Sequence, residues 1–306
     1  MIGFAGLGNI GRAVAGRLQA VAGPIMVWNR SPDKAISLEK QGALVGSSPE
    51  ELFDACEIIG ICVTSHIASG EIATRMFARA RPEQPRRTLI DLSTGSPAVA
   101  AELARQAARH GVGWIDAPVS GGPGAAAEGK LTLFMGGEVA DIAAAAPLLD
   151  ALSARKTSAG PPGAGQAMKL CNQMIVASNI IAIAETTAAA RHIGIDMSVM
   201  PEALFGGFAD SPPLRILGPR MAADDFAPKF GAIGLMEKDL LLARAMMNGA
   251  GARTPVLDLC TDLCALVEDR SSDIASLVEL FEKITRAAGQ GASTAAARRP
   301  GNNPAT

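Results

Sequence analysis

Apolar residues in the first half of the chain form short, nearly continuous runs that alternate with glycine-rich turns and with stretches of helical spacing. Strands that are apolar on both faces and alternate with helices are typical of a doubly wound parallel sheet, so we predict an α/β fold for this half. The order strand, turn, helix runs through residues 1–23, 24–43 and 87–111, and residues 42–65 give a short strand, a helix and a buried strand. Further strands are predicted within residues 112–122 and 131–137.

The pattern changes near Gly160–Gly165, where small residues and prolines precede a second half of almost entirely helical spacing. We therefore predict a sheet domain over residues 1–162 and an all-helical domain over residues 163–286. Residues 287–306 hold only small residues, polar residues and prolines besides two arginines. That composition predicts a disordered tail.

The helix that opens the second half carries a polar seam. Residues 163–185 read as a buried helix, yet polar side chains recur three and four residues apart, on one face. A buried ammonium without a partner is costly, so such a seam is expected to face solvent, a cavity or a ligand. The seam consists of Gln166, Lys169, Asn172, Gln173 and Asn179.

Composition and charge narrow the classes of function. The net charge is -2 and aromatic residues make up 4% of the chain, which argues against nucleic acids and acidic membranes as partners. The cysteine count is odd and no C-x-x-C pair occurs, which predicts reduced thiols and a cytoplasmic protein. The histidines are scattered, so we expect no metal site. The chain opens on an apolar run without a basic start, and polar residues interrupt its longest apolar helix, so we predict neither a signal peptide nor a membrane span.

The motif GLGNIG places three glycines where a dinucleotide-binding turn needs them. Gly6 allows a tight turn, Gly8 lets a pyrophosphate approach the backbone, and Gly11 lets the helix pack on the strand. The helix that follows offers free N–H groups and the positive end of its dipole to the phosphates. Because the motif follows an N-terminal strand and opens a helix, it predicts a Rossmann-like domain that binds a dinucleotide.

The end of the second predicted strand bears on which dinucleotide is bound. An acidic residue there would bind the ribose 2′-hydroxyl of NAD, but this chain has Asn29, Arg30 and Ser31. Arg30 can pair with a 2′-phosphate, and Asn29 and Ser31 can hydrogen-bond it. The sequence therefore predicts NADP(H) in preference to NAD(H).

Three further segments are expected at the carboxyl ends of the strands, where ligands of this fold bind. The segment DLSTGSP, residues 91–97, ends a strand with small hydroxyl residues. In residues 116–132 a serine and two glycines offer a hydroxyl and exposed backbone N–H groups, which suit a carboxylate. The third segment is the polar seam at Lys169 and Asn172, so the pattern predicts a small carboxylated substrate.

Five motifs of the chain occur in one order along residues 1–243: GLGNIG, DLSTGSP, DAPVSGGPGAAAEGKLTLFMGG, GAGQAMKLCNQ and KDLLLA. In these motifs the chain resembles the β-hydroxyacid dehydrogenase family, which includes 3-hydroxyisobutyrate dehydrogenases and tartronate semialdehyde reductases. The resemblance implies a Rossmann-like domain followed by an all-helical domain. It also implies nicotinamide-dependent reduction of a small carboxylated aldehyde, such as tartronate, succinic or methylmalonate semialdehyde or glyoxylate, to the hydroxy acid.

The resemblance also implies roles for individual residues. The family's catalytic lysine falls on Lys169, which would donate a proton to the carbonyl oxygen as hydride arrives, and Asn172 would hold the substrate or orient Lys169. Lys238 matches a family lysine that closes over the cofactor. The substrate-binding set is Ser120, Gly121 and Gly122. The cofactor-binding set is Gly6, Leu7, Gly8, Asn9, Ile10, Gly11, Asn29, Arg30, Ser31, Val63, Thr64, Thr94 and Lys238.

The chain departs from the family's pattern at several positions. Asn9 stands where many members have Met, Lys130 replaces a common Thr, and Gln173 replaces a second Asn. The stretch KLCNQMIVASN is similar to tartronate semialdehyde reductases, whereas the end of the second strand is similar to NADPH-preferring glyoxylate and succinic semialdehyde reductases. The substrate subgroup therefore stays open.

Two other functions share this fold. Imine reductases reduce a C=N bond, but those relatives typically lack the lysine found at position 169. Non-catalytic relatives bind nucleotide and join larger complexes, and they would lose this lysine and add basic segments. The long apolar helix that begins near Gln166 exceeds what one small domain covers, so we also predict a homodimer or homotetramer.

Overall fold

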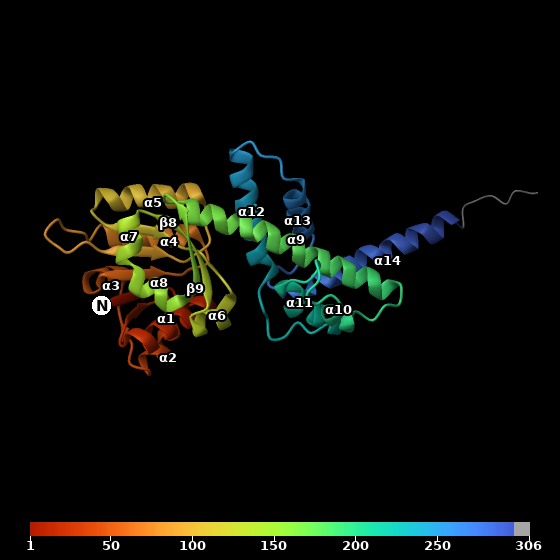
Figure 1. Ribbon diagram of the computed structural model, residues 1–306, viewed down its shortest axis with the longest axis horizontal. Helices are drawn as coiled ribbons and strands as arrows, with labels where there is room; N and C mark the ends of the chain where they lie inside the picture. Colours follow the sequence, from red (N-terminus) through yellow and green to blue (C-terminus); the bar gives the residue numbers. More distant parts are fainter. Residues whose placement is uncertain (297–306) are drawn as a thin grey trace, which may run out of the picture. The chain divides into compact units, whose positions relative to one another are not determined.

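The structure is a computed structural model that describes residues 1–296. The chain divides into two compact units, one from Met1 to Asn172 and one that begins at Gln173. The first unit holds a sheet with helices on both faces, and the second is helical (Figure 1). The prediction of an α/β fold followed by a helical region is confirmed.

The strands of the first unit form one sheet with the order β3-β2-β1-β4-β5-β6-β8-β7, and β9 pairs with β8. Strands β1 to β6 run parallel to one another, which brings their carboxyl ends to one edge. The strands described are β1 (Ile2–Ala5), β2 (Met26–Trp28), β3 (Leu44–Val45), β4 (Ile58–Ile61), β5 (Thr88–Asp91), β6 (Gly113–Asp116), β7 (Val119–Ser120), β8 (Leu131–Gly137) and β9 (Ser153–Gly160).

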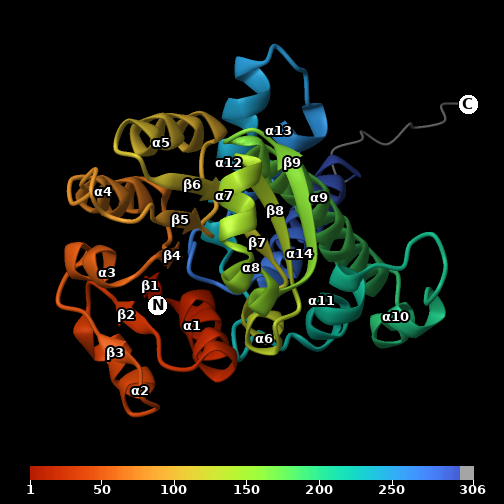
Figure 2. The same ribbon diagram turned by 60° about the vertical axis from the view of Figure 1, so that its left-hand side comes forward.

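Two layers of helices enclose this sheet (Figure 2). One apolar cluster joins the sheet to α1 and α8 through residues such as Val14, Leu18 and Leu149. A second cluster joins the other face to α3, α4 and α5 through residues such as Phe53 and Met76. The helices of this unit are α1 (Asn9–Ala22), α2 (Ile36–Glu39), α3 (Pro49–Ala55), α4 (His66–Phe77), α5 (Pro97–Arg109), α6 (Gly122–Glu128), α7 (Val139–Ala144) and α8 (Ala146–Leu152), with a 3₁₀ turn at Pro32–Ala35.

The sheet is mixed, which corrects the prediction of a parallel sheet. Strand β8 runs antiparallel to β6 and β7, because the chain reverses direction after the short helix α6. Strand β9 was not predicted, since its sequence SARKTSAG has no apolar alternation. It is an exposed strand that pairs in parallel with β8, so backbone hydrogen bonds rather than side-chain burial define it.

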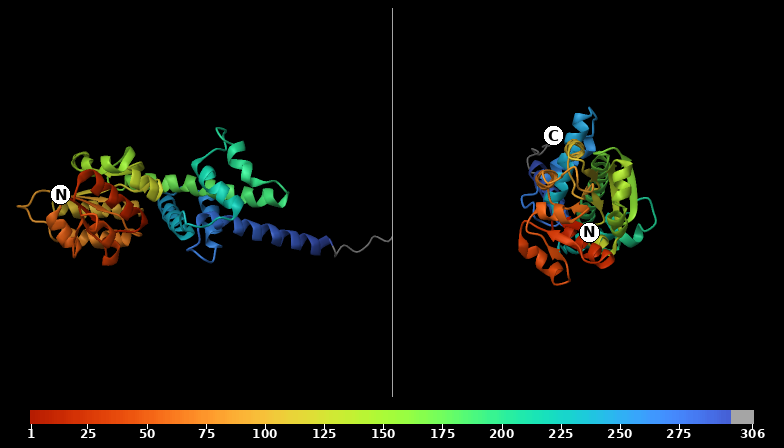
Figure 3. Two further views of the ribbon diagram at one scale, coloured as in Figure 1. Left: turned by 90° about the horizontal axis from the view of Figure 1, so that it is seen from below. Right: turned by 90° about the vertical axis from the view of Figure 1, so that its left-hand side faces the viewer.

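The described residues of the second unit form helices and no named strand (Figure 3). Helix α9 begins at Ala164 in the first unit and continues to His192 in the second. The remaining helices are α10 (Met200–Ala203), α11 (Pro212–Ala223), α12 (Ile233–Gly249), α13 (Pro255–Ala265) and α14 (Leu277–Ala296), with 3₁₀ turns at Met197–Val199 and Ile274–Ser276.

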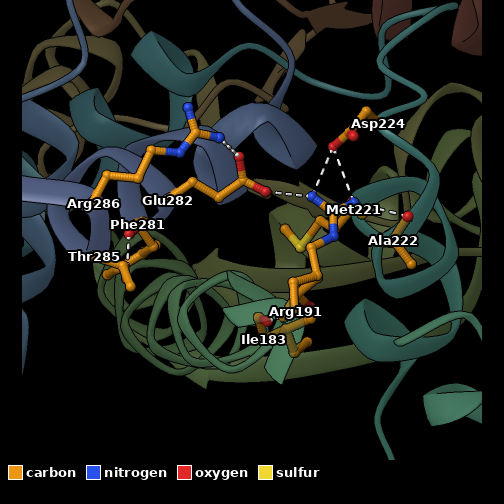
Figure 4. A network of polar contacts seen from close by, with 10 residues as sticks. Ile183, Arg191, Met221, Ala222, Asp224, Phe281, Glu282, Thr285 and Arg286 are labelled. Atoms are coloured by element: carbon orange, nitrogen blue, oxygen red, sulfur yellow. Dashed lines mark hydrogen bonds and ion pairs between the residues drawn. The ribbon is translucent and has the colours of Figure 1, made fainter. Parts of the chain in front are cut away.

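A polar network joins three helices of the second unit at the end of α9 (Figure 4). The Arg191 guanidinium contacts the carboxylates of Asp224, at 3.0 Å, and Glu282, at 2.5 Å. It also donates to the backbone carbonyls of Met221 and Ala222, at 2.6 and 2.8 Å. Charge-assisted hydrogen bonds of this kind exceed neutral ones in strength, so Arg191 fixes α9 to α11 and α14.

The two compact units divide later in the chain than the predicted domains. The two units divide after Asn172, inside α9, whereas the sequence predicted a boundary at residues 162–163. Helix α14 continues to Ala296, although residues 287–306 were predicted to be a disordered tail. Alanine is the strongest helix former and five of residues 287–296 are alanine, which accounts for the longer helix. Residues 297–306 of the predicted tail lie outside the described residues.

Among the helices of residues 1–296, α9 alone is long and apolar enough to cross a membrane by length and composition. The core helix of a soluble protein passes the same test, so this observation is weak evidence for a membrane span. The absence of a membrane partner stays a prediction.

Candidate active site

The glycine loop between β1 and α1 is built as the motif requires. Gly6 has φ +95°, and a Cβ there would lie 2.2 Å from the carbonyl oxygen of Cys62. A Cβ on Gly11 would lie 2.0 Å from the carbonyl oxygen of Gly6. Both positions therefore exclude any side chain, and they pack the loop and the first turn of α1 against the carboxyl ends of β1 and β4.

Gly8 differs from these two glycines. A Cβ on Gly8 would meet no atom of the described chain within 4 Å, its chain neighbours apart. Gly8 is the N-cap of α1, where no side-chain cap bond is described and the first helical turn carries no acidic residue. The residue is exposed, so its backbone and the first N–H groups of α1 are accessible to an anion.

The end of β2 approaches this loop through Asn29. The Asn29 Oδ1 accepts a hydrogen bond from the Leu7 backbone N–H at 2.8 Å, and its Nδ2 donates to the Ser31 carbonyl at 2.9 Å. The amide is thus engaged with the backbone at both ends and fixes the spacing between the glycine loop and the end of β2. Arg30 and Ser31 are exposed beside it. Contact of these three residues with a 2′-phosphate stays a prediction.

The ends of β4 and β5 are joined by the buried Ser93. Its hydroxyl accepts from the Val63 backbone N–H at 3.0 Å, and its own N–H donates to Asp91 Oδ1 at 2.9 Å. Val63 and Thr94 are half-buried, and Thr64 is exposed. These predicted cofactor residues therefore lie on loops that share one hydrogen-bonded frame at the carboxyl edge of the sheet.

The predicted carboxylate-binding turn lies between β7 and α6. Gly121 has φ +131° and Gly122 has φ +73°, conformations that residues with a side chain rarely adopt. Ser120 is half-buried at the end of β7. Lys130, a departure from the family's pattern, lies beyond α6 and pairs with the Glu128 carboxylate at 2.7 Å with both side chains exposed.

Lys169 lies in the second turn of α9 and is 6% exposed. One turn earlier, the side chain of the buried Gln166 accepts from the Gly95 N–H and donates to the Ser93 carbonyl, both at 2.8 Å. Asn172 is half-buried one turn after Lys169. The start of α9 therefore brings the predicted catalytic lysine to the edge of the sheet that carries the glycine loop.

A buried carboxylate beneath α9 is the site feature that the sequence analysis did not assign. Asp116 ends β6, is 0% exposed, and accepts hydrogen bonds from the N–H groups of Gly163, at 2.7 Å, and Gln166, at 2.8 Å. Burial, and to a smaller extent the nearby Asp91, raises the pKa of Asp116 to about 7, against the lowering effect of these backbone bonds. An aspartate at the end of a strand flanked by apolar residues was the available signal.

Lys238 and Asp239 lie on α12 in the second unit. The Lys238 ammonium pairs with Asp239 Oδ1 at 2.9 Å, and Asp239 Oδ2 accepts from Gln173 Nε2 at 2.8 Å. Asp239 therefore ties α12 to the part of α9 in the same unit. The predicted place of Lys238 at the cofactor stays a prediction. Within residues 1–296 no group of three or more His, Cys, Asp or Glu side chains could hold a metal ion.

The fold and the glycine loop together define a nicotinamide-dinucleotide-binding oxidoreductase, and comparison with known proteins agrees. The profile for the NAD binding domain of 6-phosphogluconate dehydrogenase matches residues 1–160. The profile for the NAD-binding region of NADP-dependent 3-hydroxyisobutyrate dehydrogenase matches residues 163–281. The chain belongs to the β-hydroxyacid dehydrogenase family, which confirms the resemblance seen in its motifs.

Individual relatives cover nearly the whole chain. The 2-hydroxy-3-oxopropionate reductase of Escherichia coli is 33% identical over 92% of this chain and 97% of its own length. The human mitochondrial 3-hydroxyisobutyrate dehydrogenase is 31% identical over 84% of this chain and 77% of its own. A Mycobacterium tuberculosis 3-hydroxyisobutyrate dehydrogenase solved with L-serine superposes with a TM-score of 0.82 at 28% identity, covering 91% of this chain and 97% of that one.

Proposed function

We propose that this protein reduces a small carboxylated aldehyde to the corresponding hydroxy acid, with NADPH as the preferred hydride donor and Lys169 as the proton donor. The observation that carries the proposal is the buried lysine at the start of α9, held at the carboxyl edge of the sheet by Gln166. The substrates named for the relatives in Escherichia coli and man, 2-hydroxy-3-oxopropionate and 3-hydroxyisobutyrate, are small hydroxy acids or their aldehydes.

The residues present fit a nicotinamide dinucleotide. The open face of Gly8 and the first N–H groups of α1 would hold the pyrophosphate. Leu7, Asn9 and Ile10 would line the same turn, with Val63, Thr64 and Thr94 along the neighbouring strand ends. When bound, the reduced cofactor supplies a hydride.

A preference for NADPH rests on the exposed cation at the end of β2. Arg30 can form charge-assisted hydrogen bonds with a 2′-phosphate, and Ser31 can donate another. No carboxylate stands there to accept from a 2′-hydroxyl, since the position holds the amide of Asn29. The Asn29 amide joins the backbone of Leu7 to that of Ser31, so it orders the loop that carries Arg30 and Ser31.

Lys169 would act on the carbonyl oxygen of the substrate. As the carbonyl carbon gains hydride, the C=O double bond becomes a single bond and negative charge develops on its oxygen. An ammonium held in a buried site stabilises this charge and then transfers its proton, which yields the alcohol and a neutral amine. In the oxidative direction the neutral amine would take the proton back. Asn172, one turn further along α9, would orient the substrate or the ammonium.

The substrate's carboxylate would bind at the turn between β7 and α6. The Ser120 hydroxyl and the backbone N–H groups of Gly121 and Gly122 are donors of the kind that anions prefer. The positive φ angles of the two glycines keep that backbone free of side chains. A substrate of a few carbon atoms, with carbonyl and carboxylate close together, would reach both this turn and Lys169.

Assembly into a homodimer or homotetramer in the cytoplasm completes the proposal. Ile175 on α9 is 73% exposed, and Leu235 and Leu241 on α12 are 50% and 44% exposed. A second copy of the chain would cover these apolar side chains and remove them from water. Light scattering that finds only monomer at micromolar concentration would contradict this part.

A spectrophotometric assay tests the activity. Purified protein is mixed with NADPH or NADH and with tartronate, succinic, methylmalonate and malonic semialdehydes and glyoxylate, and loss of reduced nicotinamide is followed. Turnover with one or two of these substrates should fall at least 1,000-fold in Lys169→Ala, on the order of a lost general acid and its charge. Lys156→Ala, at an exposed lysine of β9, is the matched control and should keep wild-type activity.

Two outcomes would contradict the proposal. Full activity of Lys169→Ala would exclude this lysine as the proton donor. Cofactor binding without turnover of any aldehyde would favour reduction of an imine, which the same assay detects with a cyclic imine, or a role without catalysis.

A further inference from the structure

Two buried polar side chains, those of Asp116 and Gln166, connect the start of α9 to the carboxyl ends of β5 and β6. Asp116 accepts from the backbone N–H groups of Gly163 and Gln166, at 2.7 and 2.8 Å. Gln166 in turn accepts from the Gly95 N–H and donates to the Ser93 carbonyl, both at 2.8 Å. Asp116, Gln166 and Ser93 are 0%, 1% and 3% exposed. We call Asp116 and Gln166 the α9 clamp.

Close backbone packing accompanies the clamp. A Cβ on Gly165 would lie 2.4 Å from the carbonyl oxygen of Phe134 and 2.5 Å from that of Asp116. Gly163 has φ +95°, and a Cβ there would lie 2.6 Å from the carbonyl oxygen of Pro97. The first turn of α9 therefore lies directly on the end of β6 and on β8, so its position along the helix axis and its rotation about that axis are tightly restricted.

We propose that Asp116 and Gln166 are positioning residues that set the register of α9 and thereby aim Lys169 at the reacting carbonyl. The proposal rests on the proposed function of Lys169. Gln166 and Lys169 are three residues apart, so they are neighbours on one helix face. Any rotation or shift of the first turn moves the ammonium along with the Gln166 amide.

The same hydrogen bonds extend to the loops predicted to bind the cofactor. Ser93, which accepts from Gln166 through its carbonyl, accepts from the Val63 N–H through its hydroxyl, at 3.0 Å. Val63 and Thr94 both belong to the predicted cofactor set. The clamp thus fixes the proton donor and the cofactor loops to one frame, and misplacement of reacting groups by about 1 Å can cost about 100-fold in rate.

Asp116 is suited to this role and unsuited to proton transfer with the substrate. Each of its oxygens already accepts a hydrogen bond from a backbone N–H at the start of α9. Its side chain has no exposed surface. Both donors to Asp116 are backbone N–H groups. An asparagine at position 116 could therefore accept from one of them through its oxygen, but its N–H₂ group would face the other N–H group, donor against donor.

Isosteric variants test the proposal. Asp116→Asn loses one acceptor, Gln166→Met loses both bonds to the β5 loop, and Gln166→Glu keeps the acceptor for the Gly95 N–H alone. Asp141→Asn is the matched control, because Asp141 is a buried carboxylate of the same unit, 5% exposed, that pairs with Arg86 instead of α9. For each protein we would measure kcat, KM, NADPH affinity by fluorescence titration, and amide hydrogen exchange over residues 163–169.

The proposal expects kcat to fall by about 30–100-fold in Asp116→Asn and Gln166→Met, with KM and NADPH affinity within about threefold of wild type. Gln166→Glu should lie between these variants and wild type. Exchange at residues 163–169 should be faster in the variants, and Asp141→Asn should keep kcat within about twofold while losing thermal stability. Unchanged kcat in the folded clamp variants, or an equal loss in Asp141→Asn, would overturn it.

Failure of the proposed function gives a different result. If wild-type protein turned over no aldehyde, the role of Lys169 would fall and the proposal with it. If wild type is active and Lys169→Ala is not, yet exchange over residues 163–169 is the same in every clamp variant, the proposed function stands and the clamp is wrong.

Discussion

Substitution of Gly8 by alanine separates cofactor binding from folding in the glycine loop. The three glycines of the loop have unequal surroundings, in line with the separate roles that the motif predicts for them. A Cβ would clash at 2.0 Å on Gly11 and at 2.2 Å on Gly6, whereas a Cβ on Gly8 meets no described atom within 4 Å outside its chain neighbours. Gly8 has φ −68° and ψ −172°, which alanine adopts without strain.

The magnitudes follow from these distances. In Gly8→Ala, loss of a favourable N-cap residue and the lower entropy of the unfolded chain nearly cancel, so stability changes by about 1 kcal/mol or less. The methyl group would hold a pyrophosphate away from the N–H groups of α1, and one lost charge-assisted hydrogen bond of about 1.5–3 kcal/mol weakens binding about 10–100-fold. In Gly11→Ala the backbone must shift by about 1 Å, which costs about 1–3 kcal/mol of stability.

Thermal melts and fluorescence titrations with NADPH and NADH test the Gly8→Ala and Gly11→Ala variants, with Gly249→Ala as the control. A Cβ on Gly249, in the second unit, also meets no described atom within 4 Å beyond its neighbours. Gly8→Ala should melt within about 4 °C of wild type and bind both dinucleotides weakly. Gly11→Ala should melt several degrees lower, and Gly249→Ala should bind normally. Wild-type affinity in a folded Gly8→Ala protein would refute the assignment of this face to the pyrophosphate.

Three further predictions follow from the same structure. The pKa of Asp116 in the folded protein, about 7, lies above its ordinary value of 3.8, so the contribution of Asp116 to stability is fully present below about pH 4 and is lost as the pH rises through 7. In denaturant titrations, wild type should therefore lose on the order of 3 kcal/mol of stability relative to Asp116→Asn between pH 4 and pH 8. A difference in stability that stays constant over this range would contradict the prediction. Arg30→Ala should weaken NADPH binding about 10–100-fold and NADH binding less than threefold; equal losses would exclude a 2′-phosphate contact. Arg191→Met should lower the free energy of unfolding of the second unit by about 2–4 kcal/mol, because it leaves Glu282 and two carbonyls without the guanidinium, and an unchanged transition would show that water replaces it.

The elements of the first unit could be predicted from the sequence to a large extent. Strands β1, β2, β4 and β5 are largely apolar runs of three or four residues, and each is followed by a turn and a helix. Gly6 and Gly11 could be assigned from spacing alone, since the steric need for glycine arises within the local strand–turn–helix unit. Lys169 stood out because an ammonium in an apolar helix demands an explanation.

No comparable signal in the sequence marks the far edge of the sheet or the end of the first unit. Strand β9 is exposed and lacks alternation, so its partner β8 alone identifies it as a strand. Helix α9 is continuous across Asn172, and no break in the chain marks where one unit ends and the next begins. Strand β9 and the division after Asn172 both depend on long-range packing, which cannot be predicted from a local pattern of polar and apolar residues.

The candidate site likewise combines features that local sequence predicts with features that depend on the fold. The amino-acid order alone shows the chemistry available at the site: a glycine turn, a cation after β2, two glycines at the start of α6 and a lysine on α9. Each of these follows from the conformational freedom or the charge of single residues. The contacts of Asn29 with Leu7 and Ser31, and those by which Asp116 and Gln166 hold the start of α9, arise only in the folded chain. The clamp joins residues 47 to 73 positions apart, and such hydrogen bonds exist only once the sheet has brought its strand ends to one edge.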